Sequence, residues 1–134
     1  MTIFASIGIS GSGIAAAQTW INTNAGNLAN MNDTGPTNQP AYAQETPVFV
    51  PVGSPGAQGT GVVVSGIALG SSAGVVVPDP SSPLADAQGN VRVPDIQLGG
   101  QLVGMIEAQN SYEANVSALS HATTAYRAAL TLGS

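Results

Sequence analysis

The sequence contains no cysteine and no lysine, and charged residues make up only 7% of its 134 positions. The absence of cysteine excludes disulfides, thiolate catalysis and cysteine-ligated metal sites. With Arg92 and Arg127 as its only basic residues, the chain cannot form a basic phosphate-binding surface. A single histidine, His121, gives no basis for a multi-histidine metal site. We therefore expect no nucleic-acid partner and no bound metal.

Carboxylates and long apolar runs are also sparse. The seven Asp and Glu side chains are scattered, and Glu107 and Glu113 fall on different faces of an expected helix because they are six residues apart. No run approaches the roughly 18 apolar residues of a membrane-spanning helix, and the start lacks the positive region of a cleaved signal peptide. We expect no enzyme, no cofactor, no membrane insertion and no cleaved signal.

The C-terminal third carries a heptad pattern of apolar residues. Stepping alternately by four and three residues from position 98 meets mainly apolar side chains, with polar breaks at Gln109 and Thr123. This pattern predicts a helix over 98–130 that packs along a partner helix. At 1.5 Å per residue the helix would be roughly 50 Å long. The apolar positions are Leu98, Leu102, Met105, Tyr112, Val116, Leu119, Tyr126 and Leu130.

The N-terminal segment repeats the pattern with smaller residues. Apolar side chains recur every seven positions at Ile7, Ile14, Ile21 and Leu28. We predict a helix from about Gly13 to Asn30, with an extension towards residue 3 left open, in which the many small residues allow close approach of a partner. Glycines at 8, 11 and 13 each cost about 1 kcal/mol in a helix, so the segment before 13 is expected to fray unless something packs on it.

The middle of the chain is rich in glycine, proline and β-branched residues. Short strands are predicted at 47–50, 61–64, 74–77 and 90–93, with a hairpin in which 62–69 returns as 73–77. The fold class is therefore mainly α with a small β insert. The terminal helices are expected to form an antiparallel, coiled-coil-like pair. One structural unit would comprise a helical segment at 1–34, a hairpin and loop insert at 35–96, and a long helix at 97–134.

A glycine-rich motif near the N-terminus offers an alternative function. Gly11, Gly13 and Ala16 satisfy G-x-G-x-x-A after an apolar run, and Asp33 follows about twenty residues later. This spacing is compatible with a small dinucleotide-binding protein. The competing interpretation is that the small residues let two helices approach closely, and the lack of a second βαβ half favours it.

Three motifs together resemble the bacterial flagellar axial proteins (rod, hook and hook-associated). The first is similar to S-G-[LI]-x-A-x followed by N-[LIV]-A-N-x-x-T; its residues are Ser12, Gly13, Asn27, Leu28, Ala29, Asn30 and Thr34. The second resembles a D-P-x-H-P-x-A-x-x-x-G-Y-V-x-x-P-N segment of proximal rod members; its residues are Asp79, Pro80, Pro83, Ala85, Gly89, Val91 and Pro94. The third is similar to Y-E-A-N, at Tyr112, Glu113, Ala114 and Asn115. The departures are Ser82 for His, Asn90 for Tyr, Asp95 for Asn and Asn110 for Arg.

The resemblance implies a structural subunit of the flagellar proximal rod. In that family the terminal helices form the inner layer of a helical tube that passes torque from the MS ring to the distal rod and hook. The implied partners are further copies of the chain, the rod proteins FlgB and FlgF, and the adaptor FliE. The implied location is the periplasmic part of the basal body, reached through the flagellar type III export system. Another axial subunit, of the FlgB or distal-rod type, is the nearest alternative.

The assembly interface is predicted to follow the heptad positions of both helices. Its residues are Ile7, Ile14, Ile21, Leu28, Leu98, Leu102, Met105, Tyr112, Val116, Leu119, Tyr126 and Leu130. A chain with so few charges is a poorly soluble monomer, and a surface of this kind suits contact with other protein.

Overall fold

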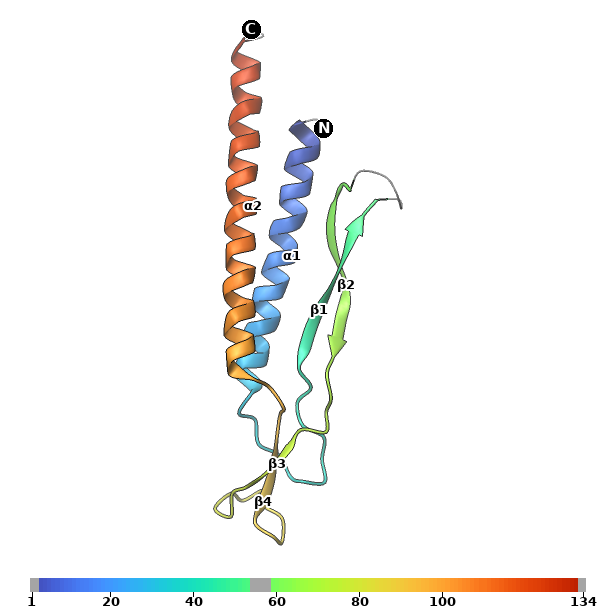
Figure 1. The fold of residues 1–134 in the computed structure, drawn as a ribbon, viewed down its shortest axis with the longest axis vertical. Helices are drawn as coiled ribbons and strands as arrows, with labels where there is room; N and C mark the ends of the chain where they lie inside the picture. The colour runs from blue at the N-terminus through green and yellow to red at the C-terminus, as the bar shows by residue number, and fades with distance from the viewer. Residues whose placement is uncertain (1–2, 54–58, 133–134) are drawn as a thin grey trace.

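Two long helices lie side by side in the computed structural model, which describes residues 3–53 and 59–132 (Figure 1). Helix α1 spans Ile3–Asn30 and helix α2 spans Leu98–Leu132. They run in opposite directions, so that the first turn of α1 and the last turn of α2 lie towards the same end of the molecule, and α2 reaches beyond α1. A small β region lies between them in sequence. The predicted fold class, mainly α with a small β insert, is confirmed.

Helix α1 starts at Ile3, so it includes the whole of the extension before Gly13 that the sequence left open. The glycines at 8 and 11 lie within it. The early turns are held by tertiary contacts: the ring of Phe4 meets that of Tyr126 edge-on, with centroids 5.2 Å apart. Packing of this kind offsets the roughly 1 kcal/mol that each glycine costs. The predicted end of α1 at Asn30 and start of α2 at Leu98 are both confirmed.

A fixed antiparallel register relates the two helices. The side chain of Asn27 bonds to Gln101 near the lower end of the pair. Further along, the backbone of Gly13 lies against the side chain of Asn115. Moving fourteen residues back along α1 (27 to 13) thus corresponds to fourteen forward along α2 (101 to 115). Fourteen residues are about four helical turns, so the same faces stay in contact along this length.

Small and polar residues, rather than the predicted apolar stripe, form the line of closest contact. The buried residues of the pair are Ser10, Ala16, Ala17, Thr23, Asn24, Asn27, Gln101 and Ala108. The apolar heptad positions predicted to form the interface are less buried. Those of α1 are all half-buried: Ile7, Ile14, Ile21 and Leu28. On α2 the half-buried ones are Met105, Tyr112, Leu119 and Tyr126. The other four, Leu98, Leu102, Val116 and Leu130, are exposed. Small residues on the contact line let the helices approach closely, and this pushes the larger side chains to its flanks or out of the contact.

A two-stranded sheet lies along α1. Strand β1, Glu45–Val52, pairs antiparallel with β2, Gly61–Leu69, from Glu45 opposite Leu69 to Val52 opposite Gly61. The register shifts once, between Val48 and Phe49. The sheet runs beside α1 on the side away from α2 (Figure 1). All four predicted strand segments occur as strands.

The predicted pairing of the middle strands is wrong. Strand β2 does not return as 73–77; instead β3, Val75–Pro78, pairs antiparallel with β4, Asn90–Val93. Backbone bonds decide this outcome: the Gly70 N–H donates to the Gln44 carbonyl, and the Ala41 N–H donates to the Ser72 carbonyl. The chain at 70–72 therefore runs on past the loop that precedes β1. The β-branched runs are too alike for their composition to select partners.

Arg92 fastens the β3–β4 end of the molecule. Its backbone exchanges two hydrogen bonds with Gly35, at 2.8 and 2.9 Å. Its guanidinium donates to the carbonyls of Thr37 and Ala73. Arg92 thus joins the loop after α1 to the antiparallel pair β3–β4, which we call the second hairpin.

Asp86 organises the loop between β3 and β4. Its carboxylate accepts hydrogen bonds from the Asn90 N–H and the Gln88 N–H, both at 2.9 Å, and from the Thr37 hydroxyl at 3.0 Å. The hydrogen bond from the backbone N–H of Asn90 is the main cause that holds the pKa of Asp86 below its usual range. The charged carboxylate therefore stabilises this loop.

We predict that stability falls in acid partly through Asp86. Because its pKa is lower in the folded protein than in the unfolded chain, its contribution is present above the unfolded value of about 4 and is lost as pH falls through the folded value. The free-energy difference between wild type and Asp86→Asn should shrink between about pH 7 and about pH 3. Urea unfolding followed by circular dichroism measures it. A difference that does not change with pH would contradict this role.

Candidate assembly surface

Asn27 joins three parts of the chain through one amide group. The side chain is fully buried, with 0% of its surface exposed. Its Nδ2 donates to the Glu45 carbonyl at 2.8 Å and to Gln101 Oε1 at 3.0 Å. Its Oδ1 accepts from the Glu45 N–H at 2.8 Å and from the Tyr42 hydroxyl at 3.2 Å. Both donors and both acceptor positions are filled, so α1, α2 and the start of β1 are locked together.

Tyr42, beside Asn27, was not expected from the sequence to have a structural role. Burial raises the pKa of its hydroxyl, and the nearby Glu45 carboxylate raises it further. The hydroxyl therefore stays protonated and can donate to Asn27. No local sequence pattern marked this residue, because its partner is fifteen positions away.

Ser12 connects α1 to the antiparallel pair β1–β2, which we call the first hairpin. Its hydroxyl donates to the carbonyl of Ile9 at 2.7 Å and accepts from the Val62 N–H at 3.1 Å. The second bond fixes the beginning of β2 against the helix. The next residue, Gly13, lies against α2. Ser12 and Gly13 therefore contact two different elements, β2 and α2.

Gly13 is required by the closeness of α2. A Cβ at this position would lie 2.5 Å from Asn115 Oδ1 and 2.7 Å from its Cγ. The Asn115 side chain is itself held by a bond from Nδ2 to the Ser111 carbonyl at 2.8 Å. The glycine therefore serves helix packing, as the competing interpretation predicted. The dinucleotide-binding alternative is wrong, because the motif lies within the continuous helix Ile3–Asn30, whereas a dinucleotide fingerprint requires the residues before its first glycine to form a strand.

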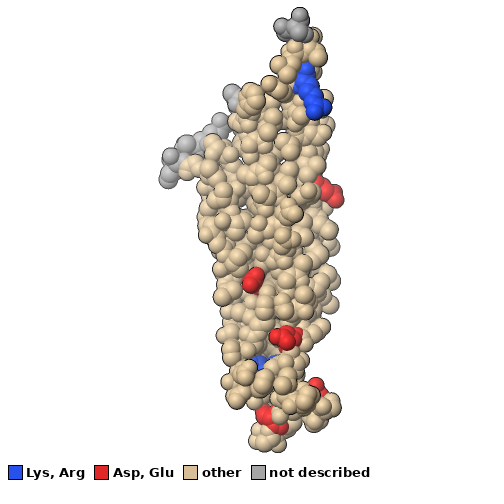
Figure 2. Space-filling view, turned by 180° about the vertical axis from the view of Figure 1, so that it is seen from behind, with Lys and Arg blue, Asp and Glu red and all other residues tan. Residues whose placement is uncertain are grey.

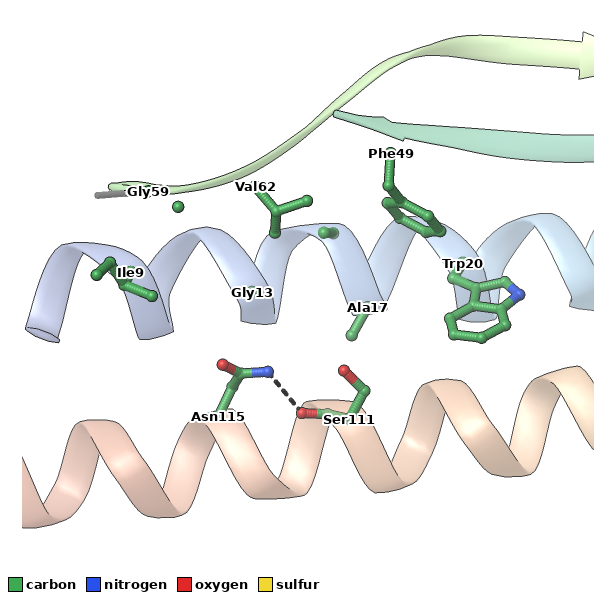
Figure 3. A pocket seen from close by; sticks show the side chains of 11 residues that line it. Ile9, Gly13, Ala17, Trp20, Phe49, Gly59, Val62, Ser111 and Asn115 are labelled. Atoms are coloured by element: carbon green, nitrogen blue, oxygen red, sulfur yellow. Dashed lines mark hydrogen bonds between the residues drawn. The ribbon is translucent and has the colours of Figure 1, made fainter. Parts of the chain in front are cut away.

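An apolar recess of about 440 Å³ lies where α1, α2 and the first hairpin meet (Figure 3). Trp20 and Phe49 form one wall, with their rings edge-on and centroids 5.8 Å apart. Ile9 and Val62 line it towards the N-terminal end of α1, and Ser111 and Asn115 line it from α2. Its chemistry suits apolar side chains rather than a charged cofactor.

Exposed apolar side chains follow α2 outside its contact with α1. The exposed fractions are 43% for Leu102, 57% for Ile106 and 40% for Val116. The face drawn in Figure 2 is mostly uncharged, with isolated carboxylates, a basic side chain near its upper end and a partly covered one near its lower end. Large exposed apolar residues on such a surface are typical of protein contacts.

The described residues offer little else to a ligand. Within 3–53 and 59–132, no three His, Asp or Glu side chains are grouped so as to hold a metal ion. Over the same ranges, neither helix combines the length and apolarity needed to cross a bilayer.

Comparison with known proteins identifies the family. The family described as "Flagellar basal body rod FlgEFG protein C-terminal" matches residues 87–132. The flagellar basal-body rod protein FlgC of Yersinia enterocolitica is 38% identical over 126 residues, which cover 93% of each chain. The chain belongs to the FlgC family. The FlgC of Aquifex aeolicus is 36% identical over 121 residues, covering 90% of this chain and 89% of that protein.

Membership of the FlgC family makes this chain a structural subunit of the flagellar basal-body rod, associated with other rod components. The resemblance to the rod family is therefore confirmed, and so is the basal body as its location. The relatives are structural rod proteins.

The FlgC motif residues differ in their structural surroundings. Ser12, Gly13 and Asn27 each hold another element against α1. In the second motif, Val91 is 1% exposed, and Gly89 has a φ of +78° where the loop turns back. In contrast, Glu113 and Ala114 of the third motif point to solvent. Tyr112 and Asn115 of the third motif are half-buried. The remaining motif residues lie at the end of α1 or just after it, in the β3–β4 loop, and directly after β4; they are Leu28, Ala29, Asn30, Thr34, Asp79, Pro80, Pro83, Ala85 and Pro94.

We predict that Asn27→Ala destabilises the folded chain by about 2–4 kcal/mol, because it leaves the polar groups of three partners without their bonds. Asn22→Ala is the matched control: it changes the same residue type on the same helix, at an exposed position. Its effect should stay within about 0.5 kcal/mol. Denaturant unfolding of both variants measures the difference, and equal effects would contradict the role of Asn27.

We predict opposite effects for two glycine substitutions in α1. Gly8→Ala meets no atom within 4 Å and should stabilise the helix by up to about 1 kcal/mol. Gly13→Ala forces the Asn115 side chain to move and should be about 1–3 kcal/mol less stable than Gly8→Ala. Adding Asn115→Ala to Gly13→Ala should narrow this gap. Thermal unfolding of the variants measures these differences in stability. An equal increase in stability from Gly8→Ala and Gly13→Ala would contradict the close contact between Gly13 and Asn115.

Proposed function

We propose that this subunit polymerises with other rod proteins into the helical tube of the proximal rod and transmits torque from the MS ring to the distal rod and hook. The observation that carries the proposal is the line of exposed apolar residues along α2, at Leu98, Leu102, Val116 and Leu130. A long helix gains most of its stability from packing, so a helix exposed along one flank calls for further partners.

In this proposal the two helices form the inner layer of the tube. The antiparallel register, which advances by two heptads on each helix between Asn27–Gln101 and Gly13–Asn115, supports coiled-coil-like packing within a chain. The flanking apolar residues supply contacts between chains. A nearly uncharged surface can be buried in such a lattice with little desolvation cost. The two hairpins lie beside and below the helix pair and form the outer part of the subunit.

The proposed neighbours are further copies of this chain, FlgB, FlgF and the adaptor FliE. The proposed location is the periplasmic part of the basal body, reached by type III export without cleavage of a signal peptide. We infer a structural role without catalysis and without a cofactor. The FlgC relatives, at 36–38% identity over 93% of the chain, favour this assignment over a FlgB-type or distal-rod subunit.

We predict that Val116→Asp prevents rod assembly while the single chain still folds. Val116 is 40% exposed in the chain, so an aspartate is tolerated there until a neighbour covers it and buries its charge. The next residue, Ser117, points about 100° away around the helix, and Ser117→Asp is the matched control. Electron microscopy of isolated basal bodies and a motility assay measure assembly, and circular dichroism of the purified chain checks the fold.

Rods of normal length with Val116→Asp would overturn the assignment of this flank to subunit contacts. Loss of rod assembly with Val116→Asp alone supports one flank of α2 that neighbouring subunits bury. Loss of rod assembly with both variants supports a helix that is covered on more than one side, as expected for the inner layer of a tube.

A further inference from the structure

The first hairpin is a sheet of only two strands, so β1 and β2 each have an outer edge that the sheet itself leaves unpaired. Along an antiparallel strand, the backbone N–H and C=O of successive residues point alternately to the two sides. The Gly70 N–H donates to the Gln44 carbonyl at 2.8 Å, just beyond the pair Glu45–Leu69. The backbone groups of Glu45 and Leu69 therefore point outward, away from the partner strand.

The outer edge of β1 is closed to a further strand. The N–H and the carbonyl of Glu45 are both bonded to the side chain of Asn27. By the same alternation the next outward positions are Pro47, Phe49 and Pro51. Proline has no N–H, so only Phe49 keeps a donor on this edge, and it lies between the two prolines. Prolines on an edge strand prevent the addition of another strand.

The outer edge of β2 is closed at its start and open at its end. The Val62 N–H donates to the Ser12 hydroxyl of α1. The strands cross in Figure 1, so the end of β2 lies on the far side of β1 from α1. Ile67 and Leu69 are the outward residues there, 41% and 69% exposed, and no described residue provides a bond to their outward N–H groups. Positions 65–69 contain neither proline nor charge, the features that usually protect an edge.

The described strands of a second copy do not fit this edge. The outer edge of β1 is closed as described above, and that of β4 is filled because Arg92 exchanges both backbone bonds with Gly35. On β3 the outward residues are Val76 and Pro78, which together offer one N–H. Two β2 edges would pair only across a two-fold axis, which gives a closed dimer, whereas copies in a helical tube are related head to tail.

We propose that the end of β2, at Ile67 and Leu69, receives an extended segment of a different rod protein as a third strand of the first hairpin. The N–H and C=O groups of both residues bond to the main chain of this segment. Its apolar side chains pack on Ile67 and Leu69, which lie on the same face of β2. The proposal rests on the proposed rod function.

The first test removes one backbone donor from the edge. Ile67→Pro deletes an outward N–H and should keep the hairpin, as Pro47 and Pro51 do in β1; circular dichroism of the purified chain checks the fold. As the sole copy in the host, it should reduce the number of basal bodies that carry hooks at least tenfold. Ile67→Thr is the matched control, because it keeps the N–H and a β-branched side chain, and its count should stay within threefold of wild type. Equal counts for the two variants overturn the proposal.

The second test uses the unaltered chain and measures amide hydrogen exchange at single residues. The Ile67 and Leu69 amides should exchange at least tenfold more slowly in purified basal bodies than in the purified chain. The Ala68 amide points towards β1 and is the internal control, with slow exchange in both samples. Equal rates for Ile67 and Leu69 in the two samples overturn the proposal.

The third test identifies the added strand. A photo-crosslinking amino acid replaces Ala68, whose side chain is exposed, and mass spectrometry identifies the crosslinked peptide from purified basal bodies. A peptide of another rod protein supports the proposal, and a peptide of this chain overturns it. Absence of the wild-type chain from purified basal bodies would contradict the proposed rod function itself; if the chain is present, a negative result concerns the β2 edge alone.

Discussion

The structure depends on a single buried amide. Asn27 fills all of its hydrogen-bonding capacity with the backbone of Glu45 and the side chains of Gln101 and Tyr42. Through these bonds the position of α2 along α1, and the point at which β1 begins beside α1, are set together. An apolar contact at this point would tolerate sliding, whereas a buried amide with several fixed partners does not. The antiparallel register of the helix pair follows from this constraint.

The contacts within the chain and the apolar surface that stays exposed consist of different kinds of residue. Ala16, Ala17 and Ala108, together with Gly13, let the helix pair close tightly while burying few large side chains. The larger aliphatic residues of α2 therefore remain outside, where Leu102 and Val116 are more than a third exposed. A chain built in this way has a small core of its own and a large reserve of apolar surface, which is the property expected of a subunit that completes its packing in a polymer.

The shortage of charge has different consequences along the helices and at the β3–β4 end of the molecule. Along the helices it leaves a surface that neighbouring subunits can cover without desolvating ions. At the β3–β4 end, the few charged groups hold the chain itself together: Arg92 donates to backbone carbonyls, and Asp86 accepts from backbone amides.

Local signals in the sequence determined the fold class, the end of α1 at Asn30, the start of α2 at Leu98 and the four strand segments, because helix periodicity and Gly/Pro punctuation act over a few neighbouring residues. The motif residues also led to the rod family. Only the tertiary structure decided the extension of α1 to Ile3, the pairing of β1 with β2, and the line of helix contact. These depend on partners far apart in sequence, such as Asn27 with Gln101 and Gly70 with Gln44, and no local pattern specifies which distant group completes a hydrogen bond.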